Sequence, residues 1–192
     1  MLPSQSLPAT QIAARRSRPA WSSVSKRAGW GLSRSSTPRI RPSRISGTTI
    51  SEAEAAELHP ELMGPDGTTT PQGVSESFAA ALRYGRDASA ARLAGAYRRT
   101  AEIGVAARAA LAGLDAFILP TAPQTAFAHD APVPAGQADF TALANFAKLP
   151  AVSVPTSPPA PANAPIGLQF IGPRFGEAAI LRMAAAWTAA SG

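Results

Sequence analysis

The chain has 192 residues, enough for one domain with a hydrophobic core, or for one small domain and a tail. Hydrophobic residues make up 45% of the chain and charged residues 16%, a composition typical of soluble globular proteins. Cysteine is absent, which excludes a disulfide framework, a thiolate zinc site and a cysteine nucleophile. No apolar run approaches the length of about 20 residues that spans a bilayer, and the N-terminus lacks the apolar central region of a secretory signal.

The positive charge is concentrated in residues 1–48. This segment holds half of the 18 basic residues and none of the 12 acidic ones. Its basic residues are Arg15, Arg16, Arg18, Lys26, Arg27, Arg34, Arg39, Arg41 and Arg44. The remaining residues, 49–192, are therefore slightly acidic overall. We expect two parts: a basic tail over 1–48 and an ordered domain over 49–192.

Residues 1–48 are also rich in serine and proline, and no apolar period persists in them. A segment of this kind buries too little apolar surface to offset the entropy lost on ordering, so we expect disorder. Three interpretations stay open. The segment is a basic arm for nucleic acid or an anionic membrane, an organelle transit peptide, or the translation of a wrong reading frame of GC-rich DNA.

The first elements expected in the ordered part are two short helices. Residues 51–63 begin with Ser51 as a helix cap and Glu54 three residues later, and Pro60 interrupts the pattern. Residues 75–84 form the second helix, with Gly85 as its stop signal. Its predicted apolar side consists of Phe78, Ala81 and Leu82.

A long helix over 88–114 is the strongest prediction. Its apolar residues fall within about a third of the helical wheel: Leu93, Tyr97, Ile103, Leu111 and Leu114. Residues 116–119 (AFIL) follow as a continuous apolar run closed by Pro120. Such a run after a helix is typical of a strand buried on both faces.

A shorter helix is predicted over 139–147, a buried strand over 151–154 and a further strand over 168–171. The proline-rich connection 156–165 separates the two strands, and a last helix over 177–190 places Ile180, Ala184 and Trp187 on one face. Helices alternating with short apolar strands predict an α/β layered fold. A sheet of three strands has exposed edges, so we expect further strands from elsewhere.

Three stretches are recognisable as a set: LDAFILPTAP (114–123), FTALANFAKLPAVSVP (140–155) and PIGLQFIGPRFGEAAILRMAAAW (165–187). In this order and spacing they resemble the C-terminal third of the amidase signature family. The resemblance covers roughly residues 50–192. It implies an α/β layered fold with a mixed sheet flanked by helices. It also implies a parent activity, the serine-dependent hydrolysis of carboxamide C–N bonds, and a likeness to the A subunit of tRNA-dependent amidotransferases.

The catalytic residues of that family are a serine nucleophile, a bridging serine and a proton-shuttling lysine, and they lie in an upstream Gly/Ser-rich region. No position here matches them, so no catalytic residue is assigned. Lys26 and Lys148 are the only lysines. Lys26 lies in the basic segment. Lys148 stands where the family usually has glycine, and we interpret it as a tolerated surface substitution.

The resemblance implies that the turn and strand around 139–155 form one wall of the substrate pocket. Its polar candidates are Asp139, Thr141 and Asn145, although Asp139 and Thr141 would also suit a helix cap. His59 and His129 are isolated and form no metal-ligand spacing. No phosphate-binding glycine loop is present, and the domain offers no aromatic platform for nucleic acid. We therefore expect no metal, no cofactor and no specific nucleic-acid partner.

The sequence thus predicts the C-terminal part of an amidase-signature hydrolase, inactive alone because the Ser-Ser-Lys region is absent. An amide substrate would bind only after complementation by the missing N-terminal part. The expected location is the cytoplasm, with no membrane span. The alternative is a non-catalytic partner-binding protein or one component of a split enzyme.

Overall fold

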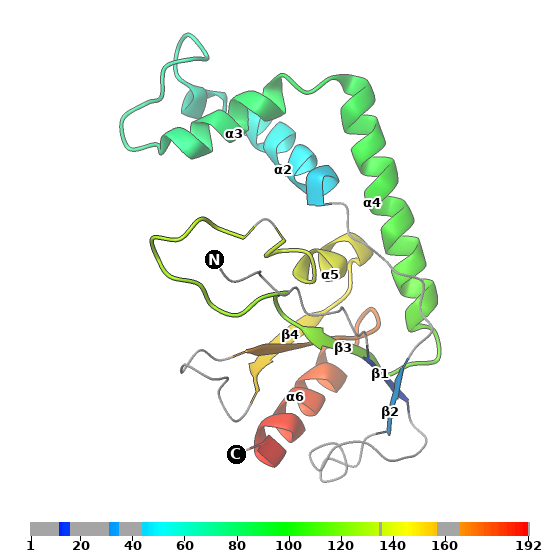
Figure 1. Ribbon diagram of the computed structural model, residues 1–192. Helices are drawn as coiled ribbons and strands as arrows, with labels where there is room; N and C mark the ends of the chain where they lie inside the picture. Colours follow the sequence, from blue (N-terminus) through cyan, green and yellow to red (C-terminus); the bar gives the residue numbers. More distant parts are fainter. Residues whose placement is uncertain (1–11, 16–30, 35–43, 135, 157–165, 192) are drawn as a thin grey trace, which may run out of the picture. The chain divides into compact units, whose positions relative to one another are not determined.

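The computed structural model describes residues 12–15, 31–34, 44–134, 136–156 and 166–191 (Figure 1). It divides into two compact units, Ser43–Glu102 on the one hand and Met1–Pro42 with Ile103–Gly192 on the other. The first unit contains α2 (Arg44–Leu58), the short 3-10 helix η1 (Pro60–Met63), α3 (Glu76–Arg86) and the first part of α4 (Ala90–Leu111). The second contains the end of α4, β1 (Ile12–Arg15), β2 (Gly31–Arg34), β3 (Ala116–Pro120), α5 (Thr141–Ala147), β4 (Ala151–Pro155), β5 (Gly167–Ile171) and α6 (Glu177–Ser191).

The second unit is built on a five-stranded sheet in the order β2-β1-β3-β5-β4. The resemblance implied a mixed sheet, whereas every described strand pairing is antiparallel. In the register of β3 with β5, Ile118 lies opposite Phe170 and Leu119 opposite Gln169. We expected further strands to pair with the three predicted ones. Two do so on the β3 side, where β1 pairs with β3 and β2 pairs with β1.

β1 and β2 were not predicted, because neither carries an alternating apolar pattern that would single it out. The predicted tail over 1–48 therefore contains two described strands, and α2 begins within it at Arg44. The expected disorder of the rest stays a prediction, since most of that segment, including Lys26, lies outside the described residues.

β3 is buried on both faces, as its continuous apolar run predicts. Phe117 and Leu119 pack in a core cluster with Ile103 and Leu111 at the end of α4 and with residues of α5. Ala116 and Ile118 face the other way and pack with Phe170, Ile180 and Ala184. The sheet thus lies between two helical layers, one formed by α5 and the end of α4 and the other by α6. Burial of its side chains is the main force that holds this unit together.

The helix α6 confirms the predicted apolar face. Ile180 and Ala184 are buried, and Trp187 packs against the same cluster. The Trp187 ring meets the Phe170 ring edge-on at a centroid distance of 6.5 Å, a geometry that aromatic pairs favour. Gly172, the residue after β5, permits the close approach of Ile180, because a Cβ at Gly172 would lie 2.5 Å from Cγ2 of Ile180.

β4 differs from its prediction as a buried strand. It is the edge strand of the described sheet, and its residues alternate between exposed and half-buried. Val152 and Val154 pack toward the α6 cluster, whereas Ala151, Ser153 and Pro155 are exposed. The sequence AVSVP alternates weakly, and a short apolar run does not reveal whether its second face is covered.

In the first unit, α2 and α3 pack around Ala56, Met63 and Leu82. The predicted stop signal Gly85 lies inside α3, which ends at Arg86. Gly85 is buried against the backbone of α2, and a Cβ at Gly85 would lie 2.1 Å from the carbonyl carbon of Glu52. Gly85 thus allows α3 to pack closely against α2, and it does not end the helix. Phe78, predicted on the buried side, is 47% exposed.

The start of α2 is also earlier than predicted. Ser51 was expected to cap a helix at its own position, but the helix begins seven residues earlier at Arg44. The Ser51 hydroxyl donates to the carbonyl of Gly47, 3.0 Å away. A serine inside a helix often forms this i to i−4 bond, so the same side chain suits both positions.

The helix α4 confirms the long amphipathic prediction, with its ends shortened by two or three residues. Ile103 and Leu111 are buried in the second unit. Tyr97, expected on the apolar face, is instead 45% exposed, and its hydroxyl donates to the carboxylate of Glu54 at 2.5 Å. In the part of the chain that the structure describes, no helix combines the length and apolar character needed to cross a membrane.

Candidate functional site

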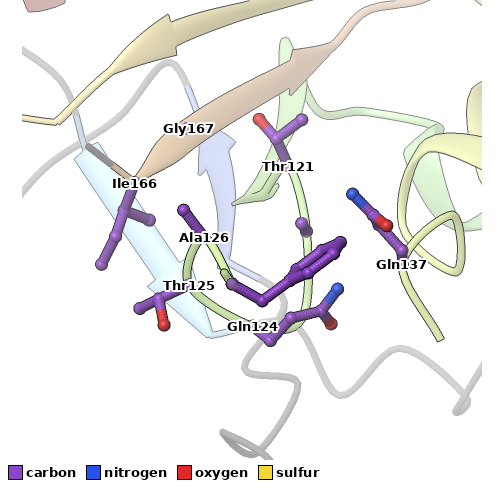
Figure 2. A pocket seen from close by; sticks show the side chains of 9 residues that line it. Thr121, Gln124, Thr125, Ala126, Gln137, Ile166 and Gly167 are labelled. Atoms are coloured by element: carbon purple, nitrogen blue, oxygen red, sulfur yellow. The ribbon is translucent and has the colours of Figure 1, made fainter. Parts of the chain in front are cut away.

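A cavity of about 220 Å³ opens at the end of β3 (Figure 2). It is lined by the loop that follows β3, by one residue of the turn before α5 and by the start of β5. The lining residues are Thr121, Ala122, Gln124, Thr125, Ala126, Phe127, Gln137, Ile166 and Gly167. All of them belong to the second unit, so the cavity is formed within one compact body.

Three residues join at one edge of the cavity. The Thr121 N–H donates to the carbonyl of Gly167 at 2.8 Å. The hydroxyls of Thr121 and Ser153 are 2.5 Å apart and share a hydrogen bond. A Cβ on Gly167 would lie 2.5 Å from Oγ1 of Thr121 and 3.0 Å from Oγ of Ser153. Glycine is therefore required at 167 for these strands to meet in this way.

These three residues come from the three stretches that carry the resemblance. Thr121 follows the first strand motif, Ser153 lies in the second and Gly167 in the third. The fold thus brings all three motifs to one edge of the cavity. This junction could not be predicted, because hydroxyls separated by 32 residues give no local pattern in the sequence.

The cavity lining is polar but uncharged. Gln124 and Gln137 contribute carboxamides, Thr125 contributes a hydroxyl, and Phe127 and Ile166 contribute apolar surface. Figure 2 shows Gln137 on the opposite side of the pocket from Ile166. Neither glutamine was predicted, because residues 121–138 contain no motif with a chemical role.

The predicted wall residues lie next to this cavity in the chain but do not line it. Asp139 is half-buried in a turn, where its N–H donates to the carbonyl of Gly136 at 3.0 Å. The Thr141 hydroxyl donates to the carbonyl of Ala138 at 3.2 Å. Asn145 is exposed on α5. The N-cap residue of α5 is Phe140, which makes no side-chain cap bond. The helix-cap alternative for Asp139 and Thr141 therefore lacks support at that position.

A buried glutamine holds this turn against the sheet. Gln169 of β5 is only 4% exposed, and its Nε2 donates to the carbonyl of Phe140 at 3.3 Å. A buried carboxamide without a partner would be costly, so this bond fixes the start of α5 relative to β5. The glutamine of the third motif thus positions the turn that carries Gln137 and Asp139.

Lys148 ends α5 in the left-handed conformation, with φ 53° and ψ 51°. Its N–H donates to the carbonyls of Ala144 and Asn145, and its side chain is exposed. Glycine favours this C-terminal position because it has no Cβ. The geometry explains the glycine that the resemblance led us to expect.

The two hydroxyls at this edge of the cavity have no activating base among the described residues. The hydrogen-bond partner of the Ser153 hydroxyl is the Thr121 hydroxyl, and no lysine or histidine among the described residues contacts either one. A serine at its ordinary pKa is a weak nucleophile without an adjacent base. Within the described segments, no three histidine or acidic side chains gather as a metal site. His59 lies beside Glu61, and His129 is exposed in the loop after β3.

The Amidase family model matches residues 68–181, more than half of the chain. This chain belongs to the amidase family. The matched residues include the long helix, the strands β3 to β5 and the residues that line the cavity at the end of β3.

Curated relatives extend this result. The chain is 41% identical over 78 residues to the A subunit of the glutamyl-tRNA(Gln) amidotransferase of Treponema denticola, covering 38% of this chain and 16% of that protein. It is 46% identical over 74 residues to the corresponding protein of Halothermothrix orenii, covering 36% of this chain and 15% of that protein. The chain therefore matches about a sixth of the length of these relatives.

Solved structures share the fold. A crystal structure of an amidase superposes with a TM-score of 0.63 at 19% identity, covering 80% of this chain and 36% of that one. An inhibitor-bound vestigial complex related to the origin of an s-triazine catabolic enzyme gives 0.68 at 22%, with 79% and 35% covered. The 6-aminohexanoate cyclic dimer hydrolase with substrate gives 0.58 at 20%, with 81% and 37% covered.

Proposed function

We propose that this chain is the C-terminal part of an amidase-signature hydrolase and forms one wall of its substrate pocket. One observation carries the proposal. Thr121, Ser153 and Gly167, one residue from each family-like stretch, meet at the edge of a polar cavity. The parent reaction would be the serine-dependent hydrolysis of a carboxamide, in the cytoplasm.

In this proposal the turn before α5 faces the substrate. Gln137 lines the cavity, and Gln169 anchors the same turn through the carbonyl of Phe140. Asp139, Thr141 and Asn145 form the polar wall beyond it. The half-buried Asp139 is the strongest of the three, because Thr141 already bonds to Ala138 and Asn145 is exposed on α5.

The wall would not catalyse hydrolysis by itself. The 192-residue sequence holds no Gly-Gly-Ser-Ser-Gly-like stretch preceded by a lysine, and the hydroxyls of Thr121 and Ser153 form no hydrogen bond to a base among the described residues. The nucleophile, its base and the oxyanion donors would come from a catalytic portion of the kind found upstream in the family.

Complementation tests the proposal. The chain is co-expressed with the N-terminal catalytic portion of the Treponema denticola relative, and ammonia release from a panel of carboxamides is measured. We expect release from the complemented pair and none from either part alone. No release from the pair would count against the proposed function.

Variants of the complemented pair test the wall itself. Asp139→Ala should lower the release of ammonia. Asp130→Ala is the matched control, because it removes the same carboxylate from an exposed position in the loop after β3 that does not line the cavity. Release that is unaffected by Asp139→Ala would remove Asp139 from the wall.

A second function, that of one component in a split enzyme, is favoured by the exposed surface of the second unit. β4 lies at the edge of the sheet formed by the described strands. Phe175, in the turn before α6, is 87% exposed and has a left-handed φ of 61°. The Arg174 guanidinium lies 5.5 Å from its ring centroid. Such edges and aromatic side chains are typical of covered surfaces. Sedimentation and thermal unfolding of the purified chain separate the outcomes. A monodisperse species that unfolds cooperatively supports a stand-alone component, and aggregation supports a severed part.

A further inference from the structure

The cavity beside β3 offers unused hydrogen-bonding groups. The carboxamides of Gln124 and Gln137 line it, and neither side chain makes a hydrogen bond to another described residue. The Thr125 hydroxyl is likewise without a described partner. Each carboxamide provides both N–H donors and a carbonyl acceptor. The group that complements them best carries a donor and an acceptor of its own, as a carboxamide does.

The lining carries no charge. The nearest charged or titratable residues along the chain are His129, Asp130 and Asp139, and none of them lines the cavity. A carboxylate or an ammonium group placed there would lose part of its water to this partly exposed lining without gaining a counter-charge. The lining therefore selects against charged ligands more strongly than it selects among neutral ones.

The apolar part of the lining limits the size and shape of the ligand. The Phe127 ring, which is 38% exposed, and the Ile166 side chain supply surface for a flat apolar body. The volume of about 220 Å³ is smaller than the roughly 300–1,000 Å³ of pockets for drug-sized ligands. A single ring with one small polar substituent matches this space.

We propose that the cavity binds the uncharged body of a small carboxamide substrate, such as a single-ring aromatic amide, and discriminates against charged amino-acid amides. This inference rests on the proposed function, because it names the substrate class of the same pocket. It assigns specificity to Gln124, Gln137 and Phe127.

Binding is measured by NMR on the ¹⁵N-labelled 192-residue chain. Benzamide, benzoate and benzylammonium have the same ring and differ in the charge of the substituent. We expect benzamide to shift the side-chain amide signals of Gln124 and Gln137. Benzoate and benzylammonium should bind about tenfold more weakly, a difference of ~1.4 kcal/mol. Phe127→Ala should weaken benzamide binding about threefold, a difference of roughly 0.7 kcal/mol.

A charge placed in the cavity should invert this preference. Gln137→Lys introduces a cation into the lining, so we expect benzoate to bind more tightly than benzamide. Gln72→Lys places the same charge at an exposed position in the other unit and should leave the preference for benzamide unchanged. Both substitutions are at exposed sites, where folding is little affected.

Equal shifts from benzamide and benzoate would overturn the proposal. So would signals that move only outside the cavity, or the absence of any shift at the solubility limit of benzamide. Failure of the proposed function is a separate result. Benzamide selectivity without hydrolysis after complementation would refute the function alone, and hydrolysis of charged amides without benzamide selectivity would refute this inference alone.

Discussion

Replacing Lys148 by glycine should stabilise the protein. Lys148 holds φ 53° and ψ 51° at the end of α5, and its side chain is exposed and forms no bond to a described residue. The left-handed conformation costs an L-residue about 1–2 kcal/mol. Glycine loses roughly 0.5–1 kcal/mol more conformational entropy on folding. The difference leaves a gain of about 0.5–1 kcal/mol for Lys148→Gly.

Thermal unfolding followed by circular dichroism measures this gain. For a protein of this size it corresponds to a rise in Tm of about 1–4 °C. Lys148→Ala is the matched control, because it removes the long charged side chain and keeps the Cβ that causes the strain. We expect the alanine variant to remain within about 0.5 kcal/mol of the original protein. If alanine stabilises as much as glycine does, or if glycine destabilises, the strain argument at this position is wrong.

The remaining predictions concern the first unit. Gly85→Ala should destabilise by about 1–3 kcal/mol, because its Cβ would meet the backbone of Glu52 at 2.1 Å. Gly95→Ala, inside α4 with no atom within 4 Å of the added Cβ, should stabilise by about 1 kcal/mol. Denaturant titration of both variants measures the change in the free energy of unfolding. Changes of the same sign in the two variants would contradict the packing difference between Gly85 and Gly95. Asp66 accepts backbone N–H bonds from Thr69 and Thr68, which lower its pKa well below the usual range. A lowered pKa stabilises the fold above the ordinary value of about 3.9 and ceases to do so as the pH falls. Asp66→Asn should therefore reduce Tm at pH 7 and lose this effect in acid, and a constant difference between about pH 7 and pH 2 would contradict it.

The periodic elements could be predicted from the sequence, because the local spacing of their apolar residues indicates which side chains are buried. The stripe of α4, the continuous apolar run of β3 and the face of α6 each specify their own environment. Elements defined by a distant partner could not be predicted. Gly85 has the sequence context of a helix stop. The α2 backbone that it contacts lies 33 residues away, so no local pattern reveals that contact. β4 has the composition of a buried strand, and its sequence does not reveal that it lies at the edge of the described sheet.

The candidate site was predicted only in part. The motif around 140–155 drew attention to a turn that lies beside the cavity, but the residue of that turn that lines the cavity is Gln137, which precedes the motif. Gln124 and Phe127 belong to an Ala/Pro-rich loop without a periodic pattern, so only tertiary structure could bring them together. Lys148 was identified by its departure from glycine, and its left-handed backbone supplies the physical reason.

We propose that these 192 residues form part of an amidase pocket without its nucleophile. The most direct test is the intact mass of the purified chain after reaction with a fluorophosphonate, which modifies activated serines. The account predicts no adduct and no release of ammonia from carboxamides. A stoichiometric adduct on a serine such as Ser153, accompanied by ammonia release, would contradict it.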